Sequence, residues 1–179
     1  MTENYMVAWL SEIVSLRLGI PPELSKQIGK AALLHDIGKI RINSSILNKP
    51  GHLTPEEFNI VKTHVEIGAE ILSRIPGSFG KLAVTVARHH HEWANGAGYL
   101  GISTDRLPIS VSIVAIADVY CALVHSRPYK EAWPQEQAFD YLQKQAGTQF
   151  SNSLVSDFIS IVREHSRQRH LSQDRGDFL

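Results

Sequence analysis

The chain has 179 residues, of which 43% are hydrophobic and 20% charged, so it has the composition of a globular domain with a substantial core. Its 18 basic residues balance its 18 acidic residues, which excludes a broad electrostatic grip on a nucleic acid polymer. The single cysteine, Cys121, excludes a disulfide scaffold or a cysteine-based zinc module and fits a reducing compartment. We expect a cytoplasmic domain, because no signal peptide opens the chain and the most apolar run, 109–124, is too short for a membrane span.

Helical periodicity runs through nearly the whole sequence, and no strand-like alternation is found. The pattern predicts helices before Gly19, over 23–35, from the capping box at Thr54 through about 72, through 79–90, and over 109–124, 135–146 and 152–165. The third of these is expected to bury Phe58 and Val61. We therefore predict an all-α, single-domain helical bundle of about six or seven helices. Residues 1–22 would form an N-terminal helix that packs on or leads into the domain of 23–165, and 166–179 a flexible tail.

Two of these helices carry residues that are able to bind a metal ion. His35 and Asp36 are adjacent at the end of an apolar helix, where they could hold one ion, or two if the carboxylate bridges. The alternative is a favourable histidine at a helix C-terminus. His64 lies one helical step from Val61 and Gly68, near the core stripe, where a histidine is more often a packed core residue than a ligand.

Three successive histidines, His89, His90 and His91, are harder to explain by chance. His90 falls on the apolar stripe of its helix, but the periodicity leaves open which two of the three face inward, and an accidental surface cluster is the alternative. Asp118 is the only charged residue between 109 and 124, and a buried carboxylate needs a cation or a proton. A buried ion pair or a cap would also satisfy it.

Together these groups form a set of imidazoles and carboxylates that suits manganese, iron or zinc. The set exceeds what one structural metal needs, and two ions would hold a bridging hydroxide for in-line attack at phosphorus. Lys39, one turn beyond the His-Asp pair, could steady a phosphate oxygen.

Several blocks in the right order resemble the HD-GYP family, a branch of the HD metal-dependent phosphohydrolases, over about three quarters of the chain. The blocks are His35-Asp36-Ile37-Gly38-Lys39, the connector from Leu47 to Thr54, Lys62-Thr63-His64, Ala117-Asp118-Val119-Tyr120, Arg127-Pro128-Tyr129-Lys130 and Gly147-Thr148-Gln149-Phe150. Counting back from Gly98-Tyr99 matches His90, His91 and Glu92 to the family's naming motif and leaves His89 outside.

The resemblance implies a phosphodiesterase that cleaves cyclic di-GMP to linear pGpG or GMP with two divalent ions, iron or manganese. The implied metal ligands are His35, Asp36, His64, His90, His91 and Asp118, with Asp36 bridging. The implied catalytic residues are Asp36 and Lys39, and the implied substrate contacts are Lys39, Tyr99, Arg127 and Lys130.

The chain also departs from the family pattern. The Gly-Tyr-Pro triplet reads Gly98-Tyr99-Leu100 in a loop one residue shorter than usual, and Asn95, Ser112 and Cys121 replace other family residues. No histidine precedes His35, where many members have a further ligand, and Glu3 or Asn4 lies near that place. These departures favour two ions over three.

Two alternatives to the active enzyme stay open. One is a degenerate receptor that binds cyclic di-GMP or a protein partner without turnover, and the other is a phosphohydrolase for a different nucleotide. The family commonly carries a regulatory domain, and the sequence leaves open both that context and a homodimer.

Overall fold

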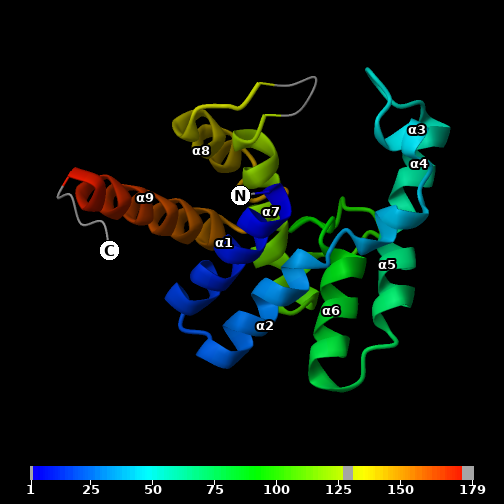
Figure 1. The fold of residues 1–179 in the computed structure, drawn as a ribbon, viewed down its shortest axis with the longest axis horizontal. Coiled ribbons are helices and arrows are strands. Elements are labelled where there is room, and N and C mark those ends of the chain that lie inside the picture. Colours follow the sequence, from blue (N-terminus) through cyan, green and yellow to red (C-terminus); the bar gives the residue numbers. More distant parts are fainter. Residues whose placement is uncertain (1, 127–130, 175–179) are drawn as a thin grey trace.

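A computed structural model of the chain describes residues 2–126 and 131–174. Most of these residues are helical, and loops join the helices (Figure 1). In chain order the elements are α1 (Glu3–Arg17), α2 (Pro22–Leu33), the 3-10 helix η1 (Ile37–Arg41), α3 (Ser44–Leu47), α4 (Pro55–Lys62), α5 (His64–Leu72), α6 (Gly77–His89), the 3-10 helix η2 (Thr104–Arg106), α7 (Ile109–Val124), α8 (Gln135–Lys144) and α9 (Asn152–Asp174). The described ranges contain no strand, only an isolated bridge between Ala146 and Phe150. The predicted all-α class is confirmed.

The predicted third helix is divided into α4 and α5 at Thr63. The Thr63 hydroxyl donates to the carbonyl oxygen of Ile60 at 2.7 Å, and its backbone N–H donates to the same carbonyl, which tightens the turn. The expectation that this helix buries Phe58 was wrong, because Phe58 is 41% exposed. A short helix, α3, lies in the predicted connector, and α9 runs past residue 165, where the pattern predicted its end.

Helix α7 lies at the centre of the domain, as its apolar composition predicts. Most of its side chains are buried, and α1, α2, α6, α8 and α9 all pack against it. Helix α1 also packs along α2, so the N-terminal helix is part of the domain core. Helices α3 and α4 project from the side of the molecule opposite α9, next to α5 (Figure 1).

No helix within residues 2–126 and 131–174 combines sufficient length with sufficient hydropathy to cross a bilayer.

Gly38, in η1, lies so close to α5 that no side chain fits between them. A Cβ atom at this position would lie 2.0 Å from the carbonyl oxygen of His64 and 2.6 Å from the amide nitrogen of Gly68. Both are backbone atoms, which cannot move without displacing α5. The glycine therefore allows the segment after His35 and Asp36 to rest directly on the helix that carries His64.

Gly38→Ala is expected to lower the free energy of unfolding by about 3 kcal/mol, because the added methyl group must push η1 away from α5. Urea denaturation measures this change. Ile40→Ala is the matched control, since Ile40 lies in the same 3-10 helix and is 76% exposed. The control should change stability by no more than about 0.5 kcal/mol. Equal stability of the two variants would contradict the packing described for Gly38.

Candidate metal centre

Three of the candidate histidines lie at the C-terminal ends of three different helices. His35 follows the end of α2, His64 follows the end of α4, and His90 caps α6. The C-terminus of a helix carries a partial negative charge, because the last carbonyl groups lack intrahelical partners. The ends of α2 and α6 therefore favour a cation near His35 and His90, whereas His64 also begins α5, whose N-terminus carries the opposite partial charge.

Each of these imidazoles is oriented by a backbone carbonyl in the last turn of the preceding helix. The Nδ1 atoms lie 2.5 Å from the Ala32 oxygen for His35, 2.7 Å from the Val61 oxygen for His64, and 3.0 Å from the Ala87 oxygen for His90. Because a carbonyl oxygen can only accept, Nδ1 must carry the hydrogen in all three rings. In the neutral rings the Nε2 atoms therefore present lone pairs, as in histidines that bind metal ions.

The Nε2 atoms converge on the carboxylate of Asp36. Its Oδ1 atom lies 3.3 Å from Nε2 of His64 and 3.7 Å from Nε2 of His90, and its Oδ2 atom lies 3.3 Å from Nε2 of His35. His35 in turn lies 3.5 Å from Oδ1 of Asp118, on α7. The two oxygens of Asp36 thus face two neighbouring groups of ligands, which is the arrangement that a bridging carboxylate requires.

His91 completes the group on the Oδ1 side of Asp36. Asp36, His64, His90 and His91 each offer one ligand atom, and these four atoms lie within 4.8 Å of one another. His89 is not a member of this group. The structure therefore brings together all six residues that the resemblance implied as ligands, in two groups that share Asp36.

The donor atoms of the cluster are better placed to bind metal ions than to hydrogen bond with one another. Nε2 of His35 and Oδ1 of Asp36 are buried and have no hydrogen-bond partner of good geometry among the described residues. Buried polar atoms without a partner cost free energy, and a divalent ion would satisfy both. Nitrogen and oxygen donors without a thiolate suit iron, manganese or zinc.

The pKa shifts of the clustered groups show that the two carboxylates favour a positive charge at the centre. Burial opposes a charge on His35, but its contacts with Asp118 and Asp36 outweigh burial and raise its pKa to about 10. Burial also opposes ionisation of Asp118, but the close contact with His35 lowers its pKa to about 2. Burial lowers the pKa of His64 to about 4 and that of His91 to about 2, so both rings are neutral near pH 7.

Two of the four implied substrate contacts, Lys39 and Tyr99, lie beside the cluster. Nζ of Lys39 lies 2.5 Å from Oδ2 of Asp36 and is directed at the centre. The Tyr99 ring lies 4.4 Å from the ring of His91, between centroids, and burial and the two carboxylates raise its pKa to about 12. Arg127 and Lys130 lie outside the described residues.

Glu92 anchors the loop that carries Tyr99, a role that the sequence analysis missed. Its carboxylate is buried and accepts hydrogen bonds from the backbone N–H groups of Leu100 at 2.7 Å and Ile102 at 2.6 Å. Proline has no N–H, so the first of these bonds depends on the departure from Gly-Tyr-Pro to Gly98-Tyr99-Leu100. Gly98 is also required, because a Cβ there would lie 2.5 Å from Cα of Glu92.

The place left by the missing upstream histidine is not filled by a clear ligand. Glu3 is not within the group of four around Asp36. Its charge instead contributes to raising the pKa of the buried Cys121 thiol, after burial and Asp118. Asn4 is exposed on α1.

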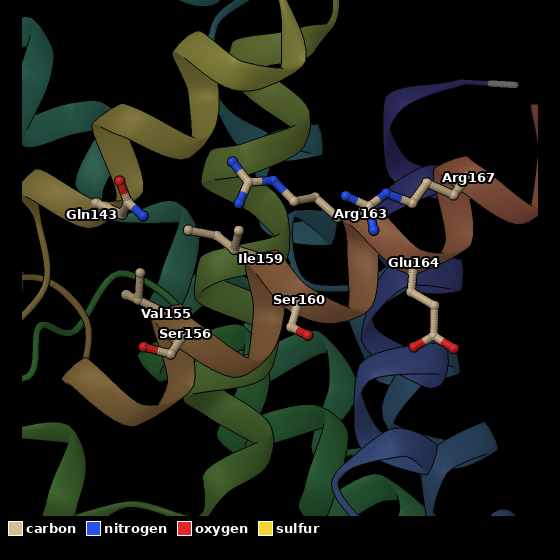
Figure 2. Close-up of a pocket in the computed structure, with 8 residues that line it drawn as sticks. All are labelled: Gln143, Val155, Ser156, Ile159, Ser160, Arg163, Glu164 and Arg167. Atoms are coloured by element: carbon tan, nitrogen blue, oxygen red, sulfur yellow. The ribbon is translucent and has the colours of Figure 1, made fainter.

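A separate groove of about 530 Å³ lies along α9 beside α8 (Figure 2). Two of its charged side chains already have partners, since Arg163 pairs with Glu136 and Glu164 pairs with Arg17. None of the candidate metal ligands lines this groove. The groove is therefore separate from the histidine and aspartate cluster.

The fold and the site define a class of protein, a helical domain built around adjacent His and Asp side chains with further histidines as donors. A family model described as "HD domain" matches residues 2–154. The chain belongs to this family, which confirms the membership that the sequence motifs predicted.

Among similar proteins, a "Cyclic di-GMP phosphodiesterase" of Thermotoga maritima is 43% identical over 88% of this chain and 43% of its own length. The "Cyclic di-GMP phosphodiesterase response regulator RpfG" of Xanthomonas campestris is 44% identical over 80% of this chain and 38% of its own length. The chain thus spans less than half the length of these relatives.

Solved structures show the same fold. The HDG"Y"P protein Bd1817 of Bdellovibrio bacteriovorus superposes with a TM-score of 0.71 at 22% identity, over 90% of this chain and 51% of that one. The HD domain of the phosphodiesterase PgpH of L. monocytogenes superposes with a TM-score of 0.64 at 17% identity, over 94% of this chain and 91% of that one.

Binding of Mn²⁺ to the metal-free chain near pH 7 is expected to release about one proton. His35 holds a proton because its pKa is raised to about 10, and it must lose that proton before Nε2 can bind an ion. The apparent affinity should therefore rise as the pH rises toward about 10. Calorimetric titrations in two buffers of different ionisation enthalpy measure the proton count. A binding heat that does not depend on the buffer would contradict the prediction.

Glu92→Gln is expected to lower the free energy of unfolding by about 2 kcal/mol, because one of the two accepting oxygens becomes an NH2 group that cannot accept from a backbone N–H. Hydrogen exchange at the amides of Leu100 and Ile102 should accelerate. Glu66→Gln is the control, since Glu66 is exposed and pairs with Arg88 at the surface. Unchanged exchange at both amides would show that Glu92 does not anchor the loop.

Proposed function

We propose that this domain is a metal-dependent phosphodiesterase that hydrolyses cyclic di-GMP to linear pGpG or GMP. The observation that carries the proposal is the position of Asp36, whose two carboxylate oxygens face His64 and His90 on one side and His35 on the other. An arrangement of two ligand groups around one carboxylate fits two divalent ions, which we propose to be iron or manganese.

The six clustered side chains would hold the ions, with His35, Asp36 and Asp118 in one group and Asp36, His64, His90 and His91 in the other. When bound, divalent ions supply Lewis acidity to a phosphodiester and lower the pKa of water. The structure supports this assignment by fixing the imidazoles in the required tautomer and leaving buried donor atoms without other partners.

Other residues of the chain would bind and orient the substrate. The ammonium group of Lys39 donates to Asp36, where it can also contact a phosphate oxygen of a substrate bound at the centre. The ring of Tyr99 packs against His91, where it would contact the substrate. Arg127 and Lys130 retain their proposed roles as contacts to the dinucleotide, since the sequence places both in one block after α7.

A hybrid cyclic dinucleotide is the second candidate substrate. The "3'3'-cGAMP-specific phosphodiesterase 2" of Vibrio cholerae is 41% identical over 83% of this chain and 29% of its own length. That similarity is close to those of the relatives named for cyclic di-GMP. Competition between the two cyclic dinucleotides for one enzyme sample gives the ratio of their kcat/KM values and identifies the preferred substrate.

Asp36→Ala is expected to remove bound metal and to lower the hydrolysis of cyclic di-GMP at least about 100-fold, because both groups of ligands lose their shared member. Metal analysis and product chromatography on the same sample measure the two effects, and circular dichroism checks that the helices persist. Asp157→Ala, at an exposed position of α9, is the control and should keep both properties. Hydrolysis by the Asp36 variant at the parent rate would contradict the bridging role.

A further inference from the structure

An exposed aromatic ring stands next to the metal centre, on the projecting helix α4. Phe58 is 41% exposed, and its ring meets that of Tyr99 edge to face, with 5.9 Å between the centroids. Tyr99 in turn contacts His91 at 4.4 Å. Two successive ring contacts therefore connect the exposed face of Phe58 with an imidazole of the centre.

A cation lies over both aromatic rings. Nζ of Lys62 is 4.9 Å from the centroid of Phe58 and 5.3 Å from that of Tyr99, within the range of cation–π attraction. Within residues 2–126 and 131–174, Lys62 has no carboxylate partner. Its charge is therefore available to acceptor atoms of a ligand that approaches the rings.

The two segments that carry these rings are fixed by their own contacts. Helix α4 begins with a complete capping box of Thr54 and Glu57, and Lys49 donates to the same glutamate at 2.6 and 2.8 Å. The loop of Tyr99 is held by Glu92 through Leu100 and Ile102. The rings are thus positioned before any ligand arrives, which lowers the entropic cost of binding.

We propose that Phe58 and Lys62, together with Tyr99, form a platform that binds a purine base of the nucleotide substrate beside the metal centre. A nucleotide carries a phosphate and a flat base on either side of a ribose, which suits a metal centre with an exposed ring next to it. The base stacks on Phe58, and Lys62 donates to acceptor atoms of a guanine such as O6 and N7. The proposal rests on the proposed function for the identity of the substrate, but base binding can be measured without hydrolysis.

The test compares the binding of GMP and of ribose 5-phosphate to the Mn²⁺-loaded protein by calorimetry. Both ligands offer a phosphate to the centre, and only GMP offers a base. The parent protein should bind GMP at least about tenfold more tightly, and Phe58→Ala should abolish this advantage. Phe58→Trp should keep it, and Lys62→Met should reduce it a few-fold. Ile60→Ala, on the same helix and 45% exposed, is the matched control and should leave it unchanged.

The outcomes separate this proposal from the proposed function. An advantage of GMP that depends on Phe58 supports the platform even if the protein fails to hydrolyse cyclic di-GMP. Equal binding of GMP and ribose 5-phosphate by the parent protein overturns it even if hydrolysis is found. An advantage that survives in Phe58→Ala, or that is lost equally in Ile60→Ala, also overturns it.

Discussion

The hydrogen bonds between three imidazoles and the carbonyl groups at three helix ends are the interaction on which the site depends. Each bond fixes the tautomer of one ring and directs its Nε2 atom at Asp36. The ends of α2 and α6 add partial negative charge to a place that already holds two carboxylates. The structure thereby concentrates negative charge and lone pairs in one small volume, where the ammonium group of Lys39 and either a proton on His35 or a bound cation balance them.

The packing of the backbone around the centre brings these side chains together. Gly38 lets η1 touch α5, which brings the pair of His35 and Asp36 against His64. Glu92 directly follows His91 in the chain, and its hydrogen bonds to Leu100 and Ile102 hold the loop of Tyr99 next to the centre. Because the ligands come from separate helices, the geometry of the centre reports on the packing of the domain. A change at a backbone contact can therefore affect the chemistry without touching a ligand.

The sequence predicted which side chains cluster around Asp36 better than it predicted their surroundings. Asp118 was identifiable because it is the only charge in an apolar helix, and the motif register selected His90 and His91 over His89. The exposure of Phe58 was not predictable from periodicity, because that reasoning assumed one continuous helix packed on the core, whereas α4 ends at Lys62. The role of Glu92 depends on a loop folding back over it, and the contact of Gly38 depends on tertiary structure that no local pattern encodes.

The central claim is that the cluster around Asp36 is a two-ion centre that hydrolyses a cyclic dinucleotide. The most direct test is the hydrolysis of cyclic di-GMP by protein prepared anaerobically and loaded separately with ferrous or manganous ions, with metal content measured on the same sample. The account predicts turnover with about two ions per chain. Bound metal and bound dinucleotide without turnover would contradict it and identify the domain as a receptor.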